Sequence, residues 1–204
     1  MRVNPDNRQT ISFASFLSAA ARAHTLAPND SMTPLLVHAT GLAALAFNVS
    51  GLVRTSDRSL RHSTGWASAL WAANNLLMGA QSAAALSALS VGRQASASAV
   101  QGQSDRVKLL TCIAFLAATL AVGLLTWNGP ATLFTTTGSM LATYAMFYMR
   151  GAVLRIAMVA VAALWMYNAW AYDSWWQMFG NAMNGGAAAF GAWRASREVT
   201  AVSA

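Results

Sequence analysis

The sequence predicts an all-α integral membrane protein with seven transmembrane helices, arranged as two parallel three-helix repeats joined by a linker helix (3+1+3). Three observations lead to this fold class. Hydrophobic residues make up 56% of the 204 residues and charged residues only 9%, whereas soluble domains carry about 25% charged residues. Apolar runs long enough to cross a bilayer alternate with short polar connections. One pattern of Arg, Trp and Asn occurs twice with the same spacing.

The apolar runs define seven predicted spans: 35–53, 62–78, 82–100, 109–127, 131–149, 154–172 and 175–193. They divide the chain into a preface (1–34), a first repeat (35–100), a linker with the fourth span (101–130), a second repeat (131–197) and a tail (198–204). Arg93 falls inside the third span. We expect its side chain to snorkel toward an interface or to mark the end of that helix.

The preface, residues 1–34, allows three interpretations. Its stretch 11–27 weakly resembles a signal peptide, although serines dilute the apolar part. An amphipathic helix lying in the membrane interface is a second interpretation. A third is that Met32 is the true start of the protein. None of the three is expected to carry the main function.

The positions of the basic residues predict the orientation. Arg and Lys lie in the connections after the first, third, fifth and seventh spans, and none lies in the connections after the other spans. Because basic loops stay in the cytoplasm, the carboxyl terminus is predicted inside and the amino terminus outside. Arg2, Arg8 and Arg22 are the exceptions, and all three precede Met32.

The repeated pattern gives the candidate binding site. Trp71 and Asn74 follow Arg61 by ten and thirteen residues, and Trp165 and Asn168 follow Arg155 in the same way. At ~1.5 Å per residue, each Trp lies ~15 Å and each Asn ~20 Å from its Arg, near the middle of a hydrocarbon layer ~30 Å thick. Parallel repeats of this kind, as in the SWEETs, place a solute site between the two halves.

We therefore predict that Trp71, Asn74, Trp165 and Asn168 bind a small polar solute, with the indoles stacking on it and the amides hydrogen-bonding to it. Asn181 and Asn184 are one turn apart at a similar depth and join this set. Asn48 and Asn75 are weaker candidates. The alternative is that these amides only hold neighbouring helices together, which is common in membrane bundles.

Other functional classes lack their usual signals. The predicted spans contain no interior carboxylate, and the chain has no phosphate-binding loop, metal-ligand cluster, or nucleophile with a base. We therefore expect no enzyme activity and no cofactor. The basic residues are scattered between apolar runs rather than gathered in a patch, which argues against nucleic acid. The expected partners are the lipid bilayer and the solute. The sequence allows a homo-oligomer and does not decide the oligomeric state.

An ordered set of residues in the second repeat resembles the YgjV-type bacterial inner-membrane proteins: Gly138, Arg150, Gly151, Leu154, Arg155, Trp165, Asn168, Ser174 and Arg194. The resemblance covers about residues 34–197 and implies an inner-membrane location. That family is similar in architecture to the PQ-loop, SWEET and PnuC-like transporters, although neither repeat here has a Pro-Gln pair.

The resemblance implies solute translocation and gives no substrate. Together with the candidate site, it leads us to expect a facilitative transporter of a small neutral polar solute that works by alternating access. The alternative is a membrane interaction or structural protein that transports nothing.

Overall fold

The computed structural model describes residues 32–202, and this part of the chain is almost entirely helical. Its elements are α2 (Met32–Val53), α3 (Asp57–Leu77), α4 (Gln81–Ala99), the 3-10 turn η1 (Val100–Gly102), α5 (Asp105–Leu125), α6 (Pro130–Tyr148), α7 (Gly151–Ala171) and α8 (Trp175–Val202). No strand occurs within the described residues. The all-α prediction is confirmed there. Of the preface, Met32 to Pro34 open α2, and the interpretations of residues 1–31 lie outside the described residues.

The helices match the seven apolar runs but begin earlier than several of them. Ser56 caps α3 by accepting a hydrogen bond from the Ser59 amide at 3.3 Å, and Ser104 caps α5 by accepting one from the Val107 amide at 3.5 Å. Both helices therefore start in a polar first turn, which an apolar window does not include. At the other end of the chain, α8 continues past the last apolar run to Val202.

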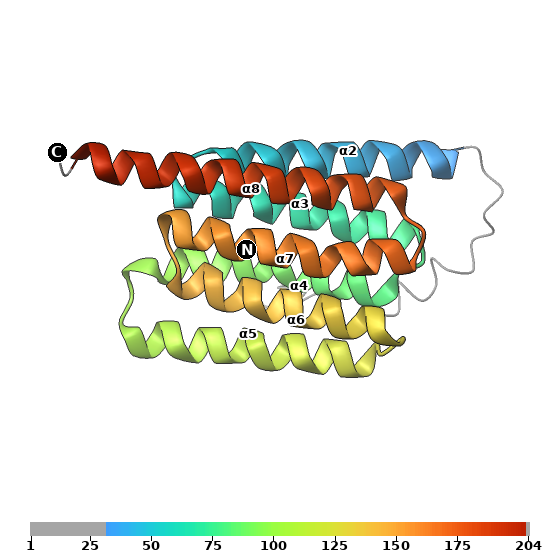
Figure 1. Ribbon diagram of the computed structural model, residues 1–204. Helices are drawn as coiled ribbons and strands as arrows, with labels where there is room; N and C mark the ends of the chain where they lie inside the picture. The colour runs from blue at the N-terminus through green and yellow to red at the C-terminus, as the bar shows by residue number, and fades with distance from the viewer. Residues whose placement is uncertain (1–31, 203–204) are drawn as a thin grey trace, which may run out of the picture.

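Tight turns join the helices at one end of the bundle. Gly79 and Gly129 have positive φ values of 74° and 86°, a conformation that glycine adopts without the steric cost of a Cβ. Pro130 follows directly and opens α6, where its fixed φ suits the first helical position. These turns reverse the chain within a few residues, so that consecutive helices run antiparallel (Figure 1).

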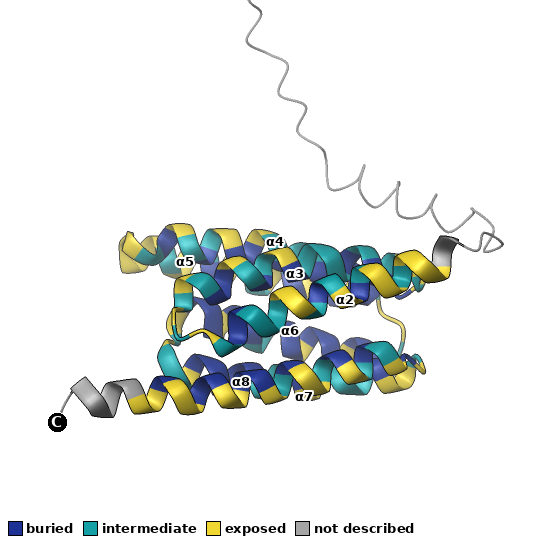
Figure 2. Ribbon diagram, turned by 90° about the horizontal axis from the view of Figure 1, so that it is seen from above, coloured by how far each residue is buried: buried dark blue, intermediate teal, exposed yellow. Residues whose placement is uncertain are grey.

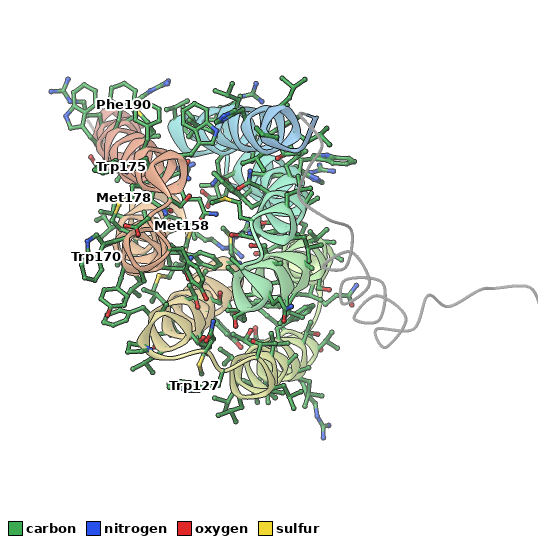
Figure 3. All side chains as sticks on the ribbon, turned by 90° about the vertical axis from the view of Figure 1, so that its right-hand side faces the viewer. Trp127, Met158, Trp170, Trp175, Met178 and Phe190 are labelled. Atoms are coloured by element: carbon green, nitrogen blue, oxygen red, sulfur yellow. The ribbon has the colours of Figure 1, made fainter. Side chains whose placement is uncertain are left out.

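The helices form two rows that face each other (Figures 1 and 3). One row is α2–α3–α4 and the other is α8–α7–α6. The rows meet where α2 contacts α8 and where α4 contacts α6, and α5 lies outside them against α4 and α6. Along the bundle, α2 runs in the same direction as α6, α3 as α7, and α4 as α8 (Figure 1).

Many large apolar side chains are exposed on the outside of the bundle, and the buried positions face the space between the rows (Figure 2). Trp127, Trp170, Trp175 and Phe190 point outward, whereas Met158 lies between the rows (Figure 3). Three described helices are long and apolar enough to cross a membrane: Pro34–Val53, Asp105–Leu125 and Gly151–Ala171. The sequence predicts seven spans. The other four helices have lower hydropathy because many of their inward positions are polar.

The prediction for Arg93 is wrong. Helix α4 continues six residues beyond it to Ala99, and the Arg93 side chain is only 6% exposed. Its Nη1 donates to the Ser139 carbonyl oxygen at 2.9 Å and to Thr143 Oγ1 at 3.2 Å, both on α6. The guanidinium therefore points across the bundle instead of along the helix to an interface.

Candidate functional site

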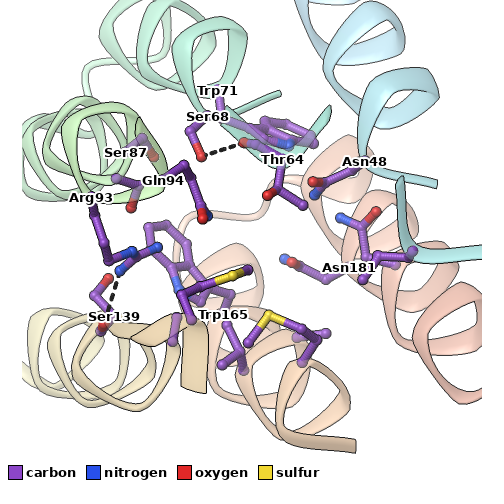
Figure 4. A pocket seen from close by; sticks show the side chains of 18 of the residues that line it. Asn48, Thr64, Ser68, Trp71, Ser87, Arg93, Gln94, Ser139, Trp165 and Asn181 are labelled. Atoms are coloured by element: carbon purple, nitrogen blue, oxygen red, sulfur yellow. Dashed lines mark hydrogen bonds between the residues drawn. The ribbon is translucent and has the colours of Figure 1, made fainter. Parts of the chain in front are cut away.

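A cavity of about 130 Å³ lies between the two rows of helices (Figure 4). Residues of α2, α3, α4, α6, α7 and α8 line it, and no described residue of α5 does. Each lining helix contributes positions three or four residues apart, which is the spacing of one helix face. The cavity is therefore formed by the inward faces of both three-helix rows.

The wall formed by α3 and α4 is polar. Helix α3 contributes Thr64, Ser68, Trp71 and Asn75, and α4 contributes Ser87, Ser90, Arg93 and Gln94. Several hydroxyls on this wall donate to the carbonyl four residues earlier in their own helix, for example Ser68 to Thr64 and Ser90 to Leu86. Their oxygens still have acceptor capacity, so this wall can accept hydrogen bonds from a solute.

The opposite wall is largely apolar. Helix α7 contributes Met158, Val161, Ala162 and Trp165, and α6 contributes Ser139, Ala142 and Met146. Helix α8 adds the polar residues Gln177, Asn181 and Asn184. The two tryptophans of the repeated pattern, Trp71 and Trp165, thus line the same cavity from opposite rows (Figure 4).

With Asn48 counted among them, the proposed solute site has seven residues, and the structure brings five of these together in the cavity lining. They are Asn48, Trp71, Trp165, Asn181 and Asn184. Asn74 and Asn168 do not line the cavity. The weaker candidate Asn75 does line it.

The helical rotation of about 100° per residue explains why Asn75 lines the cavity and Asn74 does not. From Trp71, Asn75 lies about 40° around the helix, on the side of Ser68 and Thr64, whereas Asn74 lies about 60° to the other side. Asn74 faces α2 instead. Its Nδ2 donates to the Val37 carbonyl oxygen at 2.7 Å and to Thr40 Oγ1 at 3.1 Å.

Asn168 takes the corresponding position in α7, but its amide nitrogen does not make the contacts that Asn74 makes. Its side chain is 3% exposed, and its Nδ2 is buried without an acceptor among the described residues. The two asparagines thus share a position in the repeated pattern, while only Asn74 holds two helices together.

Arg93 is a charged residue in the cavity lining, and the sequence does not predict it there. Among the described side chains no carboxylate pairs with it, and its buried Nε has no acceptor. A signal for the polar wall was present in the sequence: Ser87, Ser90 and Gln94 share one face of an otherwise Ala-rich helix. Arg93 is adjacent to that face.

At one end of the cavity, polar contacts of Arg155 and Asp57 join the two rows. We call this the basic end, because the connections holding Arg54 and Arg150 lie there, together with the first turn of α5, which holds Arg106 (Figure 1). Arg155 Nη1 of α7 lies 2.7 Å from Asp57 Oδ1 of α3, and the Arg155 side chain is fully buried. Asp57 Oδ2 also accepts the Gly151 amide at 3.0 Å.

The two arginines of the repeated pattern make reciprocal contacts at the basic end. Arg61 Nε of α3 donates to the Met146 carbonyl oxygen in the last turn of α6, at 3.2 Å. Arg155 Nη2 donates to the Arg54 carbonyl oxygen, directly after the end of α2. Each arginine therefore binds the carboxyl-terminal end of the first helix of the opposite row, where carbonyls lack partners within the helix.

At the other end of the cavity, which we call the amide end, Gln177 of α8 reaches α3. Its Nε2 donates to Asn75 Oδ1 at 2.9 Å, and Asn75 Nδ2 contacts Ser87 Oγ of α4 at 3.4 Å. The rows are thus joined by charged contacts at the basic end and by neutral amides at the amide end. No group of His, Cys, Asp and Glu side chains in the described part could hold a metal ion.

Comparison with known proteins gives one match. The family model Imp-YgjV, described as a bacterial inner membrane protein, matches residues 35–198, which is most of the chain. No curated protein and no solved structure matches it.

Proposed function

The chain belongs to this family of bacterial inner membrane proteins, and from that premise we propose that it is a SWEET-like facilitative transporter of a small polar solute. In this proposal the cavity between the rows is the binding site, and the two three-helix units move about it to expose it to one side of the membrane and then the other. The observation that carries the proposal is a cavity with one polar wall inside a bundle with an apolar outer surface.

The proposal requires all seven described helices to cross the membrane. The shortest have 19 residues, and at 1.5 Å per residue they reach about 28 Å, close to the thickness of the hydrocarbon layer. Helices α3, α4, α6 and α8 fall below the apolarity of typical spans, which is expected if their polar faces line a cavity rather than meet lipid. The basic connections at one end favour an amino terminus outside and a carboxyl terminus in the cytoplasm.

The arrangement of the rows supports two parallel repeats. Helix α2 faces α8, α3 faces α7, and α4 faces α6. A twofold axis along the bundle would exchange α2 with α6, α3 with α7, and α4 with α8, and each exchanged pair runs in the same direction (Figure 1). The reciprocal contacts of Arg61 and Arg155 follow the same exchange. Helix α5 stands outside this relation and serves as the linker.

The contacts at the two ends act as gates in this mechanism. Opening toward the cytoplasm would separate Asp57 from Arg155, and opening toward the outside would separate Asn75 from Gln177. A solute bound between the tryptophans would contact both units and favour their movement together. Inner-membrane carriers of this kind need no catalytic group.

Uptake of radiolabelled solutes into liposomes containing the purified protein tests the proposal. A substrate should enter faster than into protein-free liposomes, and Trp71→Ala, Trp165→Ala and Asn181→Ala should each slow its entry. Trp170→Ala is the matched control, because Trp170 is 60% exposed on the outer surface. Equal uptake by Trp71→Ala, Trp165→Ala and the control would refute the assignment of the cavity.

A membrane interaction protein that transports nothing is the second candidate. The contacts of Asn74 with Val37 and Thr40 favour it, because they show one polar residue of the pattern serving only helix packing. Under this alternative, no solute in a broad panel would enter the liposomes faster than into protein-free ones, and the cavity variants would change stability alone.

A further inference from the structure

We propose that the solute is a small carboxylate whose negative charge binds Arg93 and whose body lies against Trp165 and Met158. This inference rests on the proposed function, since it assigns a chemical class to the solute of the same cavity. It replaces the neutral solute expected from the sequence.

Arg93 is a buried cation without a protein anion. The described acidic side chains are Asp57, Asp105 and Asp173. Asp57 pairs with Arg155 at the basic end, and Asp105 and Asp173 are exposed at the bundle ends. A buried charge that lacks a counterion costs several kcal/mol, and in membrane proteins such a residue facing a cavity typically marks a substrate or ion pathway.

One edge of the Arg93 guanidinium has no protein partner. Both hydrogen bonds of Arg93 to α6 come from Nη1. Neither Nε nor Nη2 donates to any described protein group, and Nε is buried. The N–H groups of Nε and Nη2 lie side by side, which is the fork that binds the two oxygens of a carboxylate.

The rest of the cavity fits a ligand with hydrogen-bond donors and a short apolar body. Gln94 Oε1 and Asn184 Oδ1 are buried acceptors without a protein donor. A hydroxyl or amide N–H on the solute would satisfy them. Trp165, Met158 and Met146 provide the apolar surface opposite. A cavity of about 130 Å³ is close in size to the roughly 150 Å³ that accommodates benzene, so a short 2-hydroxy acid would fit.

Arg93 differs in this respect from the two arginines of the repeated pattern. Arg155 is occupied by Asp57 and the Arg54 carbonyl. Arg61 donates to Met146 and is absent from the cavity lining. Arg93 is the guanidinium that both lines the cavity and keeps an unused edge.

Thermal unfolding of the purified full-length protein tests the inference with matched pairs of probes. The probes are lactate and 2-hydroxybutyrate, each compared with its primary amide, which has nearly the same shape and no charge. At a hundred times its Kd, a carboxylate should raise Tm by about 5–10 °C, and its amide should raise Tm much less. Equal shifts from acid and amide, or no shift from either carboxylate, would overturn the inference without any variant.

Variants at Arg93 then assign the binding group. Arg93→Gln should weaken binding of the carboxylate by about thirtyfold or more, and Arg93→Lys should retain part of it. Arg58→Gln, at an exposed position outside the cavity, is the control and should bind as the original protein does. If Arg93→Gln folds and still binds the carboxylate with unchanged affinity, the inference is wrong.

Uptake measurements separate this inference from the proposed function. Carboxylate binding that depends on Arg93, with no uptake above protein-free liposomes, would uphold the anion site and reject transport. Uptake of neutral solutes that depends on Trp71 and Trp165, with no effect of carboxylates, would uphold transport and reject the anion site.

Discussion

Different chemistry joins the two rows of helices at the two ends of the cavity. At the basic end, a buried arginine pairs with a carboxylate, and two arginines bind main-chain carbonyls of the opposite row. At the amide end, the hydrogen bond from Gln177 to Asn75 joins the rows. Charged hydrogen bonds contribute about twice as much as neutral ones. The contacts at the basic end should therefore be the more stable.

The glycines at the two ends also indicate that the helices pack more tightly at the basic end. A Cβ on Gly191 would lie 2.0 Å from the Leu52 carbonyl oxygen, so α8 touches the main chain of α2 there. A Cβ on Gly180 would lie 3.2 Å from the Trp71 ring, which is a side chain. Main-chain contact between helices yields less easily than side-chain contact. The amide end should therefore open first, and the following changes test that expectation.

Replacement of Arg155 should have the largest effect. Arg155→Met removes the ion pair and leaves the Asp57 carboxylate without its cation, which should cost about 3 kcal/mol of stability. Thermal unfolding of the purified protein measures the loss. Arg197→Met is the control, because Arg197 is an exposed residue near the end of α8. An equal Tm for Arg155→Met and Arg197→Met would show that the ion pair does not hold the basic end.

Gly191→Ala should have the second largest effect on stability. The added Cβ meets a carbonyl oxygen, so α8 must move away from α2, at about 2 kcal/mol. Gly186→Ala on the same helix is the matched control, because a Cβ there meets nothing within 4 Å. The control should be neutral or stabilising through the higher helix propensity of alanine. Similar Tm values for both variants would contradict the close approach of α8 and α2.

Gln177→Met should have a smaller effect on stability and should clearly increase the access of water-soluble reagents to the cavity. It removes the donor to Asn75 Oδ1, at about 1 kcal/mol. In a Cys112→Ala background, a cysteine introduced by Ser90→Cys should react faster with a water-soluble thiol reagent once Gln177 is replaced. Arg155→Met in the same background provides the comparison for the basic end. Unchanged labelling after Gln177→Met would show that this hydrogen bond is not a gate.

Gly180→Ala should have the smallest effect. The Trp71 ring needs to move by only a few tenths of an ångström, and the gain in helix propensity offsets much of that cost. The change in stability should stay below about 1 kcal/mol. A loss of Tm as large as that of Gly191→Ala would mean that both ends are packed equally tightly.

Much of the fold follows from the sequence, because apolar runs and turn residues report directly on helices. The seven described helices match the seven runs, with shifts where Ser56 and Ser104 cap a polar first turn. The pairing of α2 with α8 and of α4 with α6 is a result of tertiary packing, and periodicity within single segments does not report it.

Some residues of the predicted site line the cavity and others do not, and the difference has a physical cause. The repeated spacing drew attention to Asn74 and Asn168, but a repeated position need not face the cavity. The faces that do so are marked by polar residues at three- and four-residue intervals, such as Thr64, Ser68 and Asn75. Arg93 was misplaced because a charge in an apolar run is usually assigned to an interface. Its acceptors lie on α6, 46 and 50 residues away in the sequence.

Helix α5 contributes no described residue to the cavity, and under the proposed arrangement of two parallel repeats this has an evolutionary consequence. Six helices from two separate three-helix chains would form the same lining if the chains associated side by side in the same direction. A crossing helix becomes necessary only once the two are encoded as one polypeptide, since the second half would otherwise enter upside down. Helix α5 is thus the part of the protein that a gene fusion would have had to add.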